Sequence, residues 1–190
     1  MDENRDLTMS PENATLLGVP LTLAAVAVVL VPFHLLWGGN PLVSAFKAVP
    51  WWLFAPMLVI AIAVHEALHA LVWHLASARP RPRIRFGIHW RVLMPFAHPV
   101  TPLTARAYLL GAIAPGFLMG VLPGLIAFVL GNAPLAGWSA MFLAFAVGDM
   151  MVAHTLRHVE PQVMVQDHPS RVGCQIVDAT PLSPAAQGLV

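Results

Sequence analysis

The chain has 190 residues, of which 58% are hydrophobic and only 10% are charged, and its mean hydropathy is +0.73. Water-soluble domains carry about 25% charged residues, so this composition excludes an ordinary soluble globule, and it excludes a disordered chain as well. A net charge of +1 argues against a nucleic-acid-binding protein, and the one cysteine, Cys174, excludes an internal disulfide and a cysteine-rich metal cluster.

Four apolar segments are long enough to cross a bilayer, which takes about 20 helical residues. They run over residues 16–37, 51–75, 104–130 and 134–156. The sequence therefore predicts an all-α polytopic membrane protein with four transmembrane helices. We expect a polar leader over residues 1–15, a four-helix membrane domain over 16–157 and a tail over 158–190.

The arginines predict how these spans are oriented. With four spans, the leader, the middle loop and the tail share one side of the membrane, and the other side carries only Lys47. The shared side holds nine arginines: Arg5, Arg79, Arg81, Arg83, Arg85, Arg91, Arg106, Arg157 and Arg171. Positive charge gathers on the cytoplasmic side, so we expect a multi-pass protein of the cell membrane with both termini cytoplasmic.

Two segments outside the spans have the period of strands. Apolar and polar residues alternate from about Arg83 to Phe96, which predicts one or two cytoplasmic β-strands between the second and third spans. The alternative is an amphipathic stretch lying on anionic lipid headgroups through its arginines. In the tail, residues 163–165 and 174–177 flank a turn and predict a short β-hairpin, followed by a disordered end.

The second span contains the pattern H-E-x-x-H as His65-Glu66-Ala67-Leu68-His69. Positions four apart lie on one face of a helix, so both imidazoles can bind the same metal ion. Glu66 follows the first histidine directly, where it can face a metal-bound water as a general base without being a ligand. The motif predicts a Zn²⁺ site with His65 and His69 as ligands and Glu66 as the catalytic residue.

Asp149 is the predicted third ligand. Of the nine acidic residues, only Glu66 and Asp149 lie deep within predicted spans, where an ionised group is costly unless it is paired. His65 and Asp149 each lie fourteen residues after the outer start of their span, at Trp51 and Leu135. At 1.5 Å per residue, both are roughly 21 Å from the outer boundary. A catalytic zinc takes three protein ligands and a water, and Asp149 at this depth completes the three.

Other roles for the two motif histidines remain open. One alternative is a pair of packed polar residues hydrogen-bonded between helices. Another is a haem site, with His34, His74 or His154 as a second axial ligand, although such a site has no use for Glu66. His74 and His154 also lie near cytoplasmic helix ends, where a positive charge is ordinary.

These motifs resemble those of known membrane metallopeptidases. An H-E-x-x-H in a membrane helix with a later aspartate resembles the site-2-protease-like intramembrane metallopeptidases. Over residues 50–177 the chain is more similar to a family of small four-span proteins known as putative zincin peptidases. The similar pieces are His65 to His69, Ala114-Pro115, Gly148-Asp149, Val165-Gln166-Asp167 and Gly173. Around Asp149 the chain departs from the Leu-Asp-Gly of the site-2-proteases.

The expected function is hydrolysis of peptide bonds by a membrane-embedded zinc metallopeptidase. Its expected partners are the lipid bilayer and a membrane-protein or peptide substrate, and an exposed edge over residues 84–92 would hold an unwound substrate by strand addition. His98 and Tyr108 are polar and near the correct side, but the sequence assigns no oxyanion donor. Two alternatives remain, an inactive relative that regulates a partner membrane protein and a protein that handles divalent metals. The sequence specifies neither the substrate nor the oligomeric state.

Overall fold

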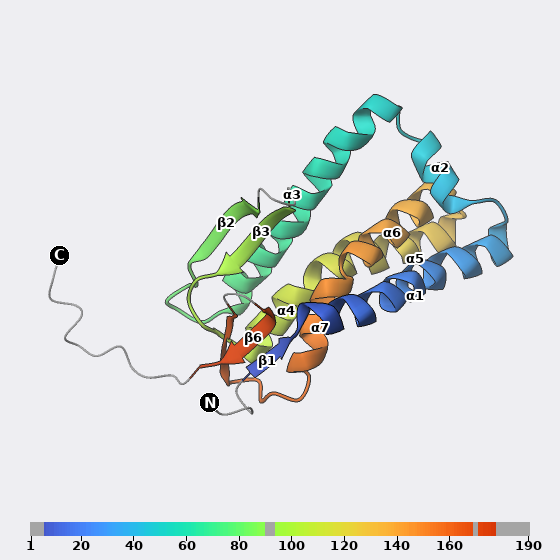
Figure 1. Cartoon of the computed structure of the whole chain (residues 1–190). Coiled ribbons are helices and arrows are strands. Elements are labelled where there is room, and N and C mark those ends of the chain that lie inside the picture. Colours follow the sequence, from blue (N-terminus) through green and yellow to red (C-terminus); the bar gives the residue numbers. More distant parts are fainter. Residues whose placement is uncertain (1–5, 90–93, 169–170, 178–190) are drawn as a thin grey trace, which may run out of the picture.

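The fold is a helical bundle with two small sheets at one end (Figure 1). It is described by a computed structural model that covers residues 6–89, 94–168 and 171–177. The chain is mostly helical, as the sequence predicts. The helices are α1 (Pro11–Trp37), α2 (Pro41–Lys47), α3 (Trp51–Ala76), α4 (Ala105–Pro115), the π-helix η2 (Gly116–Val121), α5 (Leu122–Leu130), α6 (Ala133–Phe145) and α7 (Val147–Leu156). The predicted disordered end lies outside the described residues.

Side-chain caps fix where four of the helices begin. Each cap is a Ser, Asn or Thr whose side-chain oxygen accepts a hydrogen bond from the backbone N–H three residues later, which satisfies an amide that the helix leaves unpaired. The caps are Ser10 for α1, Asn40 for α2, Thr104 for α4 and Asn132 for α6. In three of these helices a proline follows within the first turn, where its missing N–H costs nothing.

Three helices are long and apolar enough to cross a membrane, and a bent pair could form a fourth span. The three are α1, α3 and the continuous run of α4, η2 and α5. The residues of the fourth predicted span form α6 and α7, which meet at Ala146 with a bend of 49°. Ala146 has φ −79° and ψ 0°, and this ψ departs from the usual α-helical value of about −42°, so the helix bends three residues before Asp149.

The outer faces of these helices carry large apolar side chains. Trp51 is 87% exposed, Val129 79% and Leu35 78%. A water-soluble protein does not show apolar side chains in such number, whereas a lipid environment accepts them. The exposed faces are therefore compatible with a multi-pass membrane protein.

The end of the bundle away from the sheets packs through small residues. Its buried cluster consists of Val29, Phe33, Ala127, Ala136, Ala140 and Leu143, from α1, α5 and α6. A Cβ on Gly120 would lie 2.7 Å from Leu143, and one on Gly124 would lie 2.6 Å from the Ser139 hydroxyl. The glycines therefore let the third span approach α6 closely, and the Ser139 hydroxyl donates to the Gly120 carbonyl at 2.8 Å.

Within the described residues, six strands form two antiparallel sheets. The larger has the order β1 (Asp6–Met9), β6 (Val172–Ile176), β5 (Met164–Asp167) and β4 (Leu103–Thr104). The smaller pairs β2 (Ile84–His89) with β3 (Met94–Pro99), where the sequence alternation predicts strands. The predicted tail strands are present as β5 and β6. β1 and β4 were not predicted, and they join residues of the leader and of the middle loop to the tail.

A second buried cluster ties both sheets to α3 and α4. Its members are Ala70, Trp73, Ala97, Leu103, Ala105, Tyr108, Leu156, Val165 and Cys174. These residues come from α3, α4, α7 and four strands, so one core fixes the sheets against the half of α3 that carries the H-E-x-x-H motif. Figure 1 shows β3 lying along this half of α3.

Candidate metal centre

The two motif histidines lie side by side on the buried face of α3. His65 is 8% exposed and His69 is 5% exposed, although most of α3 is exposed. Their rings meet edge to face with centroids 4.9 Å apart. The four-residue spacing on a helix therefore produces the convergence that the motif predicts.

Asp149 reaches both histidines from the first turn of α7. Its Oδ2 lies 3.1 Å from Nε2 of His65, and its Oδ1 lies 3.4 Å from Nε2 of His69. Two ligand atoms about 2.1 Å from a tetrahedral zinc are about 3.4 Å apart. The structure thus brings the three predicted ligands together at a separation that fits zinc.

The backbone of α4 fixes the ring of His69. Its Nδ1–H donates to the Gly111 carbonyl at 2.8 Å, which leaves Nε2 to face Asp149. The indole of Trp73 stacks on the His69 ring at 5.3 Å and donates through Nε1–H to the Tyr108 carbonyl at 3.1 Å. This indole fills the space beside Gly111, where a Cβ would collide with it.

The sequence reasoning missed both Gly111 and Trp73. The available signal for Trp73 is its position four residues after His69, on the same face of α3. Nothing in the sequence distinguishes Gly111 from the other glycines of the third span, because its role depends on the side chain of another helix.

Glu66 is held beside the histidines by the smaller sheet. Its Oε2 accepts a hydrogen bond of 2.7 Å from the backbone N–H of Ala97 in β3. Ligand atoms of His65, Glu66 and His69 all lie within 4.8 Å of one another, so the three could hold a metal ion. Asp149 contacts both imidazoles, whereas one oxygen of Glu66 is bound to β3.

His98 and Tyr108, the two polar residues near the site, both bind Asp167. His98 Nδ1 lies 2.5 Å from Asp167 Oδ2, and the Tyr108 hydroxyl donates to Asp167 Oδ1. The three side chains come from β3, α4 and β5. Sequence reasoning named each residue but did not place them in one network.

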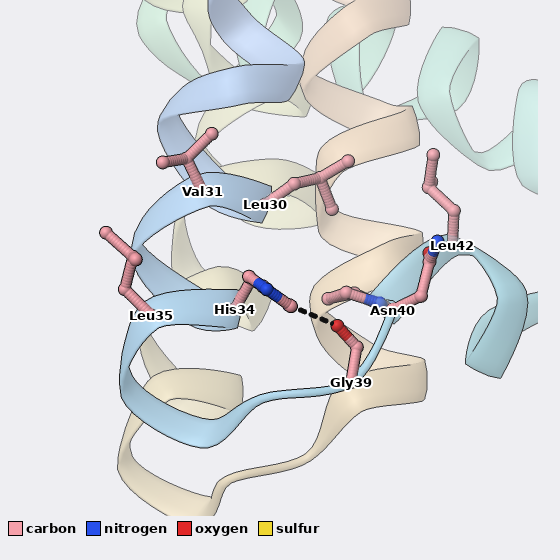
Figure 2. A pocket seen from close by; sticks show the side chains of 8 residues that line it. Leu30, Val31, His34, Leu35, Gly39, Asn40 and Leu42 are labelled. Atoms are coloured by element: carbon pink, nitrogen blue, oxygen red, sulfur yellow. Dashed lines mark hydrogen bonds between the residues drawn. The ribbon is translucent and has the colours of Figure 1, made fainter.

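The other histidines considered lie apart from this centre or point outward. His34 is near the end of α1, where its Nδ1 lies 2.6 Å from the Gly39 carbonyl in an apolar cavity of about 390 Å³ (Figure 2). Among the described residues that line this cavity, His34 is the only titratable one. His74 and His154 are exposed. Among the residues that the structure describes, none of these three histidines contacts His65 or His69. The structure therefore gives the haem alternative no support.

Cys174 is not available as a ligand either. Its side chain is buried in β6, and burial together with the nearby charge of Asp167 raises the pKa of the thiol to about 12. A thiol binds metal or attacks a carbonyl as the thiolate, which does not form at such a pKa. Cys174 is therefore part of the core.

Comparisons with known proteins give one match, to a family. No curated protein and no solved structure matches the chain. A family model described as "Putative zincin peptidase" matches residues 57–164, more than half of the chain. The match includes the H-E-x-x-H motif, Gly111 and Asp149. The chain therefore belongs to the putative zincin peptidase family, a family of metallopeptidases that implies zinc binding.

Proposed function

We propose that this protein is a membrane-embedded zinc metallopeptidase that hydrolyses peptide bonds of membrane-associated substrates. The observation that carries the proposal is the convergence of His65, His69 and Asp149 from two spans, with Glu66 held beside them. Membership of a zincin peptidase family supports the same chemistry.

The residues have separate roles in this proposal. His65, His69 and Asp149 hold the zinc, which when bound lowers the pKa of water to about 7 and polarises a carbonyl. Glu66 accepts a proton from the attacking water and later gives it to the leaving nitrogen. Strand β3 orients Glu66 through the Ala97 amide, and Gly111 orients His69.

The larger sheet supports four membrane crossings. Its strands come from before α1 (β1), from between α3 and α4 (β4) and from after α7 (β5 and β6). Hydrogen-bonded strands lie on the same side of a membrane, so an even number of crossings must separate them. This parity favours counting α6 and α7 together as one broken span, because three crossings would place β1 and β6 on opposite sides.

Charge supports a cytoplasmic position for the sheets. The side that holds them carries nine of the ten basic residues, and the positive-inside rule assigns that side to the cytoplasm. The protein would then be a multi-pass protein of the cell membrane with both termini cytoplasmic. Its partners would be the lipid bilayer and a membrane-protein or peptide substrate, and its charge gives no reason to expect nucleic acid.

The depth of the centre suits hydrolysis. His69 lies seven residues before the end of α3, which is about 10 Å along the helix axis. A centre so close to the sheets has a short path to water, which the reaction consumes.

The test replaces Glu66 by glutamine. Glu66→Gln keeps the size and the hydrogen-bonding capacity of the side chain but cannot accept the proton. We expect zinc to stay near one per chain while cleavage of a co-reconstituted single-span peptide falls by roughly 10²- to 10⁴-fold. Glu160→Gln makes the same change at an exposed position in the tail and serves as the matched control.

The same experiment separates the alternatives. Full cleavage by Glu66→Gln would contradict the peptidase. A metal-handling protein would keep its zinc-dependent flux in this variant. A wild-type protein that binds zinc but cleaves none of a panel of single-span peptides would favour the inactive, regulatory relative.

A further inference from the structure

We propose that His98, oriented by Asp167 and Tyr108, donates a hydrogen bond from Nε2 to the carbonyl oxygen of the peptide bond being cleaved. The inference rests on the proposed function and adds to it a catalytic residue on strand β3. It assigns a role to the network of polar side chains beside the candidate zinc centre.

The network is built around a partly buried carboxylate with two donors. The Asp167 side chain is 17% exposed, and its two oxygens are taken by different elements. Oδ2 faces Nδ1 of His98 at 2.5 Å, and Oδ1 accepts from the Tyr108 hydroxyl. Tyr108 is itself buried, at 7% exposure. Such a carboxylate fixes the plane and the tautomer of an imidazole, because Nδ1 must carry a hydrogen toward it.

The network is joined to the zinc centre through α4. Tyr108 and Gly111 are three residues apart and share a face of this helix. Trp73 packs between them, with its ring 5.7 Å from the ring of Tyr108 and 5.3 Å from that of His69. The carboxylate of Asp167 is thus anchored about one helical turn from the carbonyl that anchors His69.

The second connection runs along strand β3. The Ala97 amide binds Glu66, and His98 is the next residue. The charges of Glu66 and His69 are close enough to act on the His98 imidazole. His98 therefore lies at the edge of the centre, beside the carboxylate that receives the proton.

The imidazole has a free and accessible side. Half of the His98 side chain is exposed although its Nδ1 is bound, so the ring is not enclosed by the sheet. The hydrogen bond to Asp167 raises the pKa of His98 above its usual 6.5, against the opposing effect of burial. The raised pKa favours the protonated form of the ring, in which Nε2 also carries a hydrogen.

The chemical step balances with these residues. The water oxygen forms a bond to the carbonyl carbon while one water proton passes to Glu66, and the π pair of the C=O bond moves onto the oxygen. The Nε2–H of His98 donates to this oxygen more strongly as its negative charge develops, which lowers the barrier. When the C–N bond breaks, Glu66 returns the proton to the leaving nitrogen, and His98 is unchanged.

The test compares binding of the substrate with stabilisation of the transition state. His98→Gln is prepared with His74→Gln as the matched control, since His74 is an exposed histidine on α3. Zinc content, kcat and KM are measured with a single-span peptide. The Kd of a phosphinic peptide, whose tetrahedral anion resembles the transition state, is measured by calorimetry. The Kd of the peptide substrate is measured on the Glu66→Gln background, with and without His98→Gln.

We expect His98→Gln to keep its zinc and its affinity for the substrate peptide. Its kcat should fall, and it should bind the phosphinic peptide more weakly, because the glutamine amide is neutral and is not the imidazole that Asp167 holds. Complete removal of one oxyanion donor costs roughly 10²- to 10³-fold, which is the upper limit for this variant. Equal loss of substrate and phosphinate binding, or no loss of either, would overturn the inference and leave a merely structural network.

Asp167→Asn adds a second measurement, the pH dependence of kcat, which would not change if Asp167 had only a structural role. The groups facing His98 are Asp167 from β5, Glu66 and His69 from α3 and Tyr108 from α4. Without the charge of Asp167, His98 should lose its proton at a lower pH, so the alkaline limb of kcat should shift downward. An unshifted limb would overturn the role of Asp167 in positioning His98. If the wild type neither cleaves nor binds the phosphinate, both proposals fail, whereas normal cleavage by His98→Gln removes this inference alone.

Discussion

The two ends of the bundle use histidine in opposite ways. At the end where α1 meets α2, His34 lies in an apolar cavity and faces one backbone carbonyl (Figure 2). At the end that carries the sheets, His65 and His69 face a carboxylate from another span and a second backbone carbonyl. A histidine in an apolar helix is therefore not a site by itself.

The difference lies in what surrounds the helices. The α1–α2 end packs mainly through alanines, glycines and a few larger apolar groups, and its polar side chains Asn40 and Ser139 bind backbone groups. The other end has strands whose amides and side chains reach the helices, including Ala97 and Asp167. Polar chemistry in so apolar a chain is concentrated where strand backbone meets a helix face.

The largest expected effect comes from removing one of the proposed zinc ligands at the end that carries the sheets. Asp149→Ala or His69→Ala removes one of three protein ligands, so zinc should fall from about one per chain to near zero, and cleavage should be lost with it. His34→Ala is the control and should keep both, because His34 contacts none of the ligands in the described contacts. Zinc content by mass spectrometry and cleavage of a single-span peptide are the measurements. Zinc retained in Asp149→Ala would show that Glu66 is a ligand instead.

The next effect concerns the packing that orients His69. A Cβ at Gly111 collides with the Trp73 indole, so Gly111→Ala should destabilise the protein by roughly 1–3 kcal/mol and weaken zinc binding. At Gly148, one residue before Asp149, a Cβ meets nothing within 4 Å, and Gly148→Ala should leave stability unchanged. Thermal unfolding in detergent, with and without zinc, compares the two variants. Equal stability would show that the indole moves aside freely.

A smaller effect is the pH dependence of the His98–Asp167 pair. The pKa of His98 is raised above 6.5 in the folded protein. Protonated His98 therefore contributes fully to stability below about pH 6.5, and this contribution is lost as the pH rises through the raised pKa. The stability difference between wild type and His98→Gln should therefore shrink from pH 6 to pH 9. Unfolding in detergent at several pH values measures it. A difference that grows with pH would contradict the pairing.

The smallest effect belongs to the surface of the larger sheet. Arg171 and Asp6 form an ion pair of 2.6 Å, and both side chains are more than a third exposed. Exposed pairs contribute little, so Arg171→Ala should change zinc content and cleavage by less than about twofold. A clear loss of cleavage would mean that β1 and β6 act on the centre, and polar contacts at this end would then matter beyond the core.

Local patterns in the sequence predicted much of this structure. Helical spacing placed His65 and His69 together, and the cost of a charge in a membrane singled out Asp149. Alternation predicted strands where β2 and β3 lie, and apolar length predicted the long helices. Each of these signals is contained within one segment of the chain.

What the sequence could not supply depends on contacts between segments. The bend at Ala146 has no proline of its own, and a Cβ on Gly116 would lie 2.9 Å from the Ala146 side chain, so another helix determines the space there. β1 is four residues long and pairs with a strand at the far end of the chain. The Gly111 carbonyl and the Ala97 amide bind their partners through the backbone, so these two contacts could not be predicted from residue type.

The pairing of β1 with β6 also sets an order for biosynthesis. Asp6–Met9 leaves the ribosome early and cannot pair until Val172–Ile176 has been made. At ordinary rates of translation this delay is on the order of ten seconds. A nascent chain arrested before Val172 would contain helices α1 to α7 and all four residues of the candidate centre, yet β1 and β5 would each lack the strand between them. The larger sheet can therefore form only after translation has passed β6.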